Sequence, residues 1–153
     1  MKIFLASDHA GFELKRFLLE RLSLAGHEAR DLGAREFAPD DDYPDYVSLA
    51  AREISRDPSA ARAIVIGGSG QGEAICANKF YGVRAAVYYG GNTDTVKLSR
   101  EHNDANVLSL GARFLSPRDA LNAVNLWLAT PFSGDERHKR RNQKLYTMGK
   151  QEQ

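Results

Sequence analysis

The alternation of short apolar runs with longer segments of helical periodicity most constrains what this chain can fold into. Strands are expected where apolar and β-branched side chains gather in short runs, at residues 3–7, 28–32, 63–66, 83–89 and 106–110. Helices are expected at residues 12–24, 44–56, 74–80, 94–102, 117–130 and 135–148. Strands separated by helices form parallel sheets that are covered on both faces. The sequence therefore predicts an α/β fold, a Rossmann-like three-layer sandwich with a five-stranded parallel sheet and a C-terminal tail helix.

Length and helix-boundary signals indicate a single folded unit. A chain of 153 residues matches one domain of ordinary size. Gly26 is typical of a helix end, and Ser116 followed by Pro117 is typical of a helix start. We therefore expect residues 1–153 to form one domain, with residues 135–149 as a basic tail helix.

Charge and cysteine content exclude several classes of function. The net charge of +1 gives no overall field that would attract nucleic acid or an anionic membrane, so neither is expected as a partner. Cys76 is the only cysteine, which excludes an internal disulfide and a multi-cysteine metal site. The apolar run after Met1 is too short for a signal peptide, and no stretch approaches the ~20 apolar residues of a membrane helix. A cytoplasmic location is the expectation.

A glycine-rich segment, Gly67–Glu73, connects the predicted strand at 63–66 to the helix that follows it. Glycines adopt backbone conformations closed to other residues, so several N–H groups can converge on one point. This loop either binds a phosphate or a developing oxyanion, which we favour, or is a plain strand-to-helix turn. It is not a P-loop, because the Gly-Lys-Ser/Thr ending is missing.

Polar side chains flank this loop and the first strand. Glu73 is expected in the first turn of a helix, where it is either a favourable partner of the helix dipole or a general base beside an oxyanion site. Asp8 and His9 directly follow the first strand and form either a surface turn or part of a site. In parallel sheets, ligands bind at the carboxyl ends of the strands, which favours a functional role for both residues.

Further candidates lie in the second half of the chain. His102 and Asn103 end a predicted helix, where the histidine is either a capping charge or a proton shuttle. Arg137 and Arg141 are four residues apart and share a helix face, an arrangement suited to a phosphate, although basic runs are usually solvated. The acidic run at residues 40–42 is interpreted as a solvated loop.

The ordered set of these segments resembles the ribose-5-phosphate isomerase B family, which includes galactose-6-phosphate isomerase subunits. The resemblance covers essentially the whole chain. Its matching pieces are Ser7–Phe12, Asp42–Pro44, Gly68–Gly72, Ala77–Lys79, Arg100–Leu108, Gly111–Arg113, and Arg137, His138 and Arg141.

The resemblance implies an aldose–ketose isomerase that interconverts ribose 5-phosphate and ribulose 5-phosphate through an enediolate, in the pentose phosphate pathway. It implies that His102 opens the furanose ring and that Asp8, His9 and Asn103 hold sugar hydroxyls or the ring oxygen. Arg113, Arg137 and Arg141 would bind the phosphate. Backbone donors for the enediolate would come from Gly68, Ser69, Gly70, Gln71 and Gly72. The family forms homodimers, sometimes tetramers, so each site would draw on two chains.

The residue at position 67 distinguishes two branches of this family. Some members carry a cysteine base at the position of Gly67, and another branch uses a glutamate just after the glycine loop. The chain matches the second branch, which implies that Glu73 is the base. This route needs no metal and no cofactor. The alternatives are an isomerase of a hexose or tetrose phosphate, and a non-catalytic phosphosugar-binding module.

Overall fold

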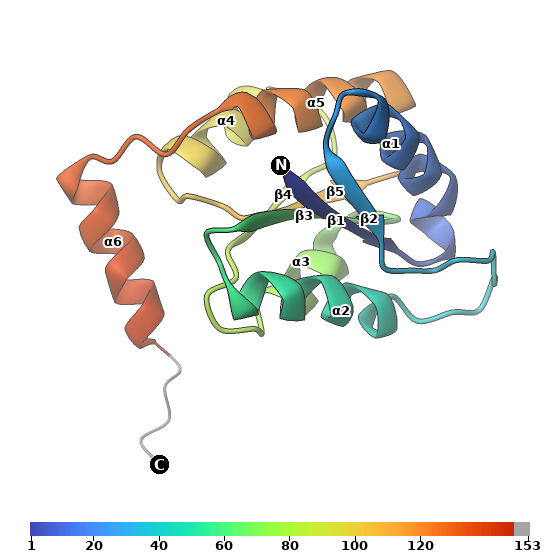
Figure 1. The fold of residues 1–153 in the computed structure, drawn as a ribbon, viewed down its shortest axis with the longest axis horizontal. Helices are drawn as coiled ribbons and strands as arrows, with labels where there is room; N and C mark the ends of the chain where they lie inside the picture. Colours follow the sequence, from blue (N-terminus) through green and yellow to red (C-terminus); the bar gives the residue numbers. More distant parts are fainter. Residues whose placement is uncertain (149–153) are drawn as a thin grey trace, which may run out of the picture.

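The computed structural model describes residues 1–148, and within them five parallel strands form one sheet in the order β2-β1-β3-β5-β4 (Figure 1). The strands are β1 (Lys2–Ser7), β2 (Glu28–Asp31), β3 (Ala61–Gly67), β4 (Ala85–Tyr88) and β5 (Val107–Gly111). The predicted five-stranded parallel sheet is confirmed. Because β3 is central, the segments that follow β1, β3 and β5 emerge next to one another.

Helices cover both faces of the sheet. They are α1 (Phe12–Leu24), α2 (Tyr43–Arg56), α3 (Gln71–Ala77), α4 (Asp94–Glu101), α5 (Pro117–Ala129) and α6 (Glu136–Thr147), with a 3-10 turn η1 (His9–Gly11) before α1. Helices α1, α4 and α5 lie on one face, α2 and α3 on the other, and α6 stands beside the sandwich (Figure 1). The three-layer arrangement and the C-terminal helix are confirmed. None of the helices within residues 1–148 has the length and apolarity needed to cross a membrane.

Strand β3 shows how the sequence generates two cores. Successive side chains of a strand point to opposite faces. Ile64 and Ile66 pack with α1 and α5 residues, whereas Ala63 and Val65 pack with α2. All four are fully buried, as a strand covered on both faces requires.

The boundaries of some elements differ from the expectation. Helix α3 spans 71–77 rather than 74–80, because Gly70 takes a left-handed conformation (φ 78°) that turns the chain into the helix earlier. Strand β4 is shorter than the expected 83–89. The caps at Ser116 and Pro117 are confirmed: the Ser116 hydroxyl accepts a hydrogen bond from the Asp119 amide. Residue 149 of the predicted tail helix lies outside the described residues.

Candidate active site

The carboxyl ends of β1, β3 and β5 bring three segments of the chain together. Ser7 is in register with Ile66, and Gly67 with Gly111. The backbone N–H of Arg113 donates to the carbonyl of Gly68 at 3.1 Å, so the segment after β5 lies against the glycine loop. The guanidinium of Arg113 covers Gly68 so closely that a Cβ there would lie 3.0 Å from its Cζ.

The glycine loop is held in place by β5. The Ser109 hydroxyl donates to the carbonyl of Gly70 at 2.5 Å. A Cβ on Gly70 would meet the backbone of Leu110 at 2.9 Å, so this position needs glycine for both its left-handed φ and the close approach. Ser69 and Gln71 flank Gly70, and the backbone N–H of Gln71 donates a weak hydrogen bond to the Ser69 hydroxyl at 3.4 Å. The loop is therefore a fixed part of the sheet edge.

Glu73 lies in the first turn of α3, as predicted, and only 4% of its surface is exposed. Its carboxylate lies over the backbone of β3: a Cβ built on Gly67 would be 1.8 Å from Oε1 and 2.1 Å from Cδ. The carboxylate thus occupies the volume that any side chain at position 67 would need. Burial raises the pKa of Glu73, its own backbone N–H opposes this, and the negative charge of Asp8 adds to the rise.

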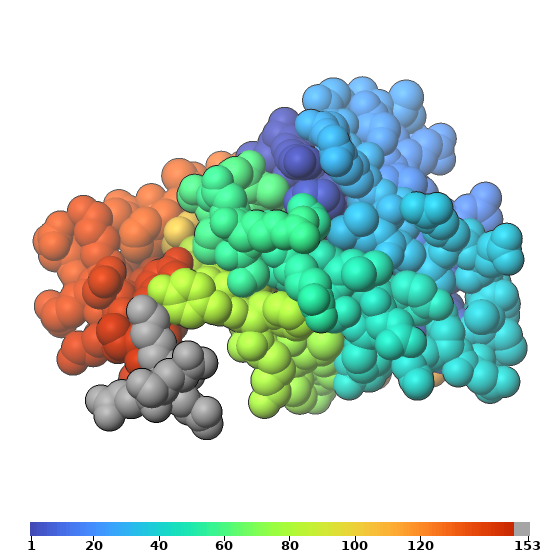
Figure 2. Space-filling view, turned by 60° about the horizontal axis from the view of Figure 1, so that its bottom comes forward, coloured from blue at the N-terminus to red at the C-terminus, as the bar shows by residue number. Residues whose placement is uncertain are grey.

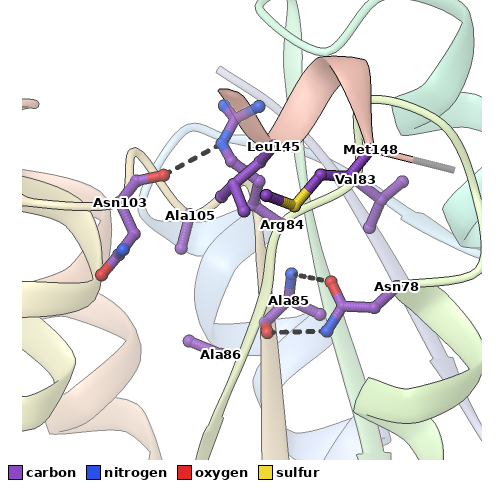
Figure 3. A pocket seen from close by; sticks show the side chains of 9 residues that line it. All are labelled: Asn78, Val83, Arg84, Ala85, Ala86, Asn103, Ala105, Leu145 and Met148. Atoms are coloured by element: carbon purple, nitrogen blue, oxygen red, sulfur yellow. Dashed lines mark hydrogen bonds between the residues drawn. The ribbon is translucent and has the colours of Figure 1, made fainter. Parts of the chain in front are cut away.

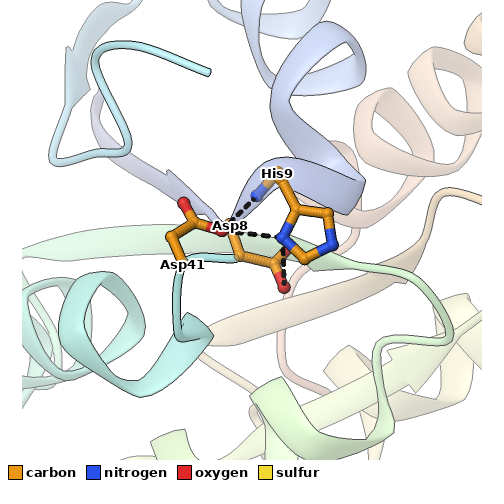
Figure 4. A group of neighbouring side chains, drawn as sticks. All are labelled: Asp8, His9 and Asp41. Carbon is orange, nitrogen blue, oxygen red and sulfur yellow. Dashed lines mark hydrogen bonds and ion pairs between the residues drawn. The ribbon is translucent and has the colours of Figure 1, made fainter. Parts of the chain in front are cut away.

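Asp8 and His9 join this group from the end of β1. Asp8 is buried and caps η1, accepting a hydrogen bond from the Ala10 amide at 3.0 Å. His9 is paired with Asp41, whose Oδ1 lies 2.7 Å from the ring Nδ1 (Figure 4). Arg113 is close enough for its positive charge to lower the pKa of His9, so the end of β1 lies near the segment after β5.

The interpretation of residues 40–42 as a solvated loop is wrong for Asp41. Its side chain is only 7% exposed, and it accepts hydrogen bonds from both the backbone N–H and the ring of His9. Asp40 and Asp42 are exposed, as expected. The partner of Asp41 lies 32 residues earlier in the chain, so no local pattern marked this residue.

His102, Asn103 and the basic tail form a second cluster. The His102 ring packs on that of His138 with 4.2 Å between centroids, and the His102 carbonyl accepts a hydrogen bond from Asn142. His138 is buried, which lowers its pKa, and the neighbouring His102 lowers it further. Arg137 and Arg141 are exposed on α6, the helix that carries His138. The structure thus brings together His102 and the helix that bears both arginines.

The first cluster, formed by the glycine loop with Glu73, Asp8, His9 and Arg113, and the second cluster lie at opposite ends of the strands in one chain. Helix α4 starts after the carboxyl end of β4 and leads through His102 to the amino end of β5. Glu73 lies over Gly67, which is in register with Gly111 at the other end of β5. Four residue steps separate Val107 from Gly111, or about 13 Å. Glu73 and His102 of one chain therefore do not meet.

Arg84, which sequence reasoning missed, and Asp104, which it placed only within the matching segment Arg100–Leu108, organise the second cluster. Arg84 donates from Nε to the carbonyls of Asn103 and Asp104 at 3.0 and 2.9 Å and pairs with the Asp104 carboxylate at 2.9 Å. The same carboxylate pairs with Arg100 at 2.8 Å, and Asp104 adopts a positive φ of 46°. Arg84 also donates to the Tyr146 hydroxyl, which fastens α6. Only the Arg100–Asp104 pair has the four-residue spacing of a helix pair, whereas Arg84 lies 20 residues from Asp104 and has no such signal.

A pocket of about 480 Å³ lies between β4 and α6, lined among others by Arg84, Asn103 and Leu145 (Figure 3). On its floor, the Asn78 side chain exchanges two hydrogen bonds with the backbone of Ala85, which ties the end of α3 to edge strand β4. Figure 2 shows the face of the molecule formed by α2 and α3, with the segment after α3 beside α6. Among the described residues that line this pocket, Asn103 is the only predicted site residue, so the pocket belongs to the second cluster.

The family model, the similar sequences and the similar structures all belong to sugar-phosphate isomerases. The family described as Ribose/Galactose Isomerase matches residues 3–145. Ribose-5-phosphate isomerase B of Mycobacterium leprae is 42% identical over 141 residues, covering 92% of this chain and 85% of that protein. The structure of ribose-5-phosphate isomerase B from Mycoplasma genitalium with bound ribulose-5-phosphate is 37% identical, with a TM-score of 0.91, and the match covers 95% of this chain and 94% of that one. The Clostridium thermocellum enzyme is 41% identical with a TM-score of 0.89 and covers 96% of both chains.

Proposed function

This chain belongs to the ribose/galactose isomerase family, and we propose that it interconverts D-ribose 5-phosphate and D-ribulose 5-phosphate with Glu73 as the catalytic base. The observation that carries the proposal is the buried carboxylate of Glu73, packed over Gly67 at the edge where the polar strand ends converge. The family resemblance places the base of one branch at position 67. Here a carboxylate from α3 fills the space that such a side chain would take.

The reaction is a proton transfer between neighbouring carbons. Glu73 takes the proton from C2 of the open-chain aldose, and the electron pair moves onto the carbonyl oxygen to give an enediolate. The same carboxyl group returns the proton to C1, while the proton of the C2 hydroxyl passes to O1, which leaves the carbonyl at C2 and a hydroxyl at C1. A raised pKa suits a base that must accept and return a proton near neutral pH.

The rest of the first cluster binds the substrate in this proposal. Backbone N–H groups of Gly68–Gly72 stabilise the enediolate oxygens, since fixed donors act where charge develops. Asp8 and His9 hold sugar hydroxyls or the ring oxygen. Arg113, which lies over Gly68, is the cation of this cluster nearest the loop and binds the phosphate together with arginines of the second cluster.

Each site in this proposal combines the first cluster of one chain with the second cluster of another, in a homodimer. The separation of Glu73 and His102 in one chain supports this arrangement, because ring opening and proton transfer act on adjacent parts of one small sugar. Apolar surface beside edge strand β4 also supports self-association: Ile75 on α3 is 63% exposed and Leu145 on α6 is 49% exposed. A cytoplasmic location and a metal- and cofactor-independent reaction stay predictions.

The first test is turnover of ribose 5-phosphate by purified protein after exhaustive chelation, with allose, galactose and erythrose phosphates in parallel. Activity confined to the pentose phosphate supports the proposal. Activity on another sugar phosphate alone would replace the substrate and keep the mechanism. Glu73→Gln should abolish turnover, and near-normal activity of that variant would reject Glu73 as the base.

The shared site is tested by mixing two inactive variants. Glu73→Gln and His102→Asn are each expected to be inactive. A mixed dimer regains one intact site, in which the His102→Asn chain supplies Glu73 and the Glu73→Gln chain supplies His102. With random exchange, half of the dimers are mixed and one of their two sites works, so about a quarter of wild-type activity should return. No recovery in a sample where exchange is verified by mass spectrometry would reject the two-chain site.

A further inference from the structure

Asp41 and His9 are joined by two hydrogen bonds although they lie 32 residues apart in sequence. A single oxygen of Asp41, Oδ1, accepts from the His9 backbone N–H at 2.9 Å and lies 2.7 Å from its ring Nδ1 (Figure 4). The two bonds fix both the main chain and the ring of His9. The Phe37 ring stands nearly perpendicular to the imidazole, with the two centroids 6.5 Å apart.

This contact determines which ring nitrogen of His9 carries a proton. An ionised carboxylate only accepts hydrogen bonds, so Nδ1 must be the donor. Figure 4 shows the other ring nitrogen, Nε2, on the side of the ring away from Asp41. Nε2 therefore carries a lone pair when the ring is neutral and an N–H when it is protonated.

The charges around His9 favour the protonated ring. Three charged groups face it: Asp41 from the loop before α2, Asp8 at the end of β1, and Arg113 after β5. The hydrogen bond that the His9 ring donates to Asp41 is the largest influence and raises the pKa of His9. Burial lowers this pKa, the charge of Asp8 raises it, and the charge of Arg113 lowers it. Burial alone would raise the pKa of Asp41, but its bonds from His9 and the nearby Tyr46 hydroxyl outweigh this and hold the pKa below its usual value.

We propose that Asp41 is a positioning residue that holds the imidazolium of His9 with Nε2–H directed at an oxygen of the bound sugar phosphate. Asp41 does not touch substrate; it acts through His9. The inference rests on the proposed function, in which His9 lies in the substrate site, and assigns a role to a residue outside the family pattern quoted above. The protonated ring complements an anionic substrate beside Arg113 and so contributes mainly to binding.

Asp41→Asn tests this with little change of shape, because the amide oxygen can still accept from His9. Asp40→Asn is the matched control: it removes the same charge from the neighbouring, exposed position. Measured over pH, the KM of Asp41→Asn relative to wild type should be near one at about pH 6. It should rise toward about tenfold at about pH 8, as the loss of one charge-assisted hydrogen bond predicts. The kcat should change little, and Asp40→Asn should follow wild type throughout.

A purely structural role of Asp41 predicts a different pattern, namely a KM ratio that does not depend on pH, and this result would overturn the inference. A second measurement needs no variant of Asp41. Nitrogen chemical shifts of the His9 ring in the wild-type protein, assigned with His9→Gln, should show a protonated Nδ1 and a midpoint above the ordinary 6.5.

A neutral His9 ring with its proton on Nε2, or a midpoint below that value, would also overturn the inference. The NMR measurement separates this inference from the proposed function. Absence of isomerase activity would reject the function, while the ring titration would still decide whether Asp41 holds His9.

Discussion

Gly67→Ala tests whether the position of the Glu73 carboxylate determines the rate. The substitution adds one methyl group at the end of β3. That methyl carbon would lie 1.8 Å from Oε1 of Glu73, whereas ordinary van der Waals contact begins at 3.4 Å. The shortfall is 3.4 − 1.8 = 1.6 Å, and the three nearest heavy atoms all belong to Glu73, so its carboxylate must move by roughly that distance.

The expected effect follows from the precision that proton transfer requires. Misplacement of a reacting group by about 1 Å can lower the rate about 100-fold. We therefore expect Gly67→Ala to lower kcat of ribose 5-phosphate isomerisation by at least about 100-fold. KM should change less, because Arg113 and the phosphate-binding arginines are not displaced.

A double-mutant cycle supplies the control. In a Glu73→Gln background the base is already absent, so adding Gly67→Ala should lower the residual rate no further. In a Glu73→Ala background the clashing atoms are gone, so Gly67→Ala should no longer destabilise the fold in urea denaturation. The assignment of Glu73 would be refuted if Gly67→Ala kept more than a tenth of wild-type kcat. It would also be refuted if Gly67→Ala lowered the rate equally in the wild-type and the Glu73→Gln backgrounds.

Three further predictions concern stability. Burial raises the pKa of Glu73, so the charged carboxylate opposes folding. Glu73→Gln should therefore raise the free energy of unfolding near pH 8. This gain should shrink as the pH falls, first through the pKa of Glu73 in the folded protein and then through its ordinary pKa in the unfolded chain. Lys15 is fully buried and its Nζ bonds Asp31 at 2.6 Å, whereas Asp31 is 27% exposed. Asp31→Ala should cost about 3 kcal/mol, because the buried ammonium would lose its carboxylate partner and keep only the Ala34 carbonyl as acceptor; Lys15→Met should cost less, both by urea denaturation. Ser116→Ala removes the cap of α5 and should cost about 1 kcal/mol in the same assay.

Each of these predictions has an outcome that contradicts it. A pH-independent difference between Glu73→Gln and wild type would show that burial does not shift this carboxyl. A larger loss for Lys15→Met than for Asp31→Ala would mean that packing of the lysine chain, not its charge, dominates. A neutral Ser116→Ala would mean that Pro117 alone sets the start of α5.

The sequence by itself determined the architecture and one half of the candidate site. Helical and strand periodicities are properties of neighbouring residues, so the alternation predicted a parallel sheet without any long-range information. The glycine loop and the place of Glu73 in the first turn of α3 were also readable, because a loop between a strand and a helix must lie at the carboxyl edge of the sheet.

Only the tertiary structure decided which of the candidate residues meet. Glu73 and His102 were expected in one site that draws on two chains, and within one chain the path of α4 puts them at opposite ends of β5. Asp41 was taken for a solvated carboxylate because its neighbours in sequence are acidic, and its burial depends on His9, 32 residues away. The pairing of Arg84 with Asp104, 20 residues away, was likewise not predicted. Burial and pairing depend on distances in space between segments remote in the chain, and a local pattern carries no measure of such distances.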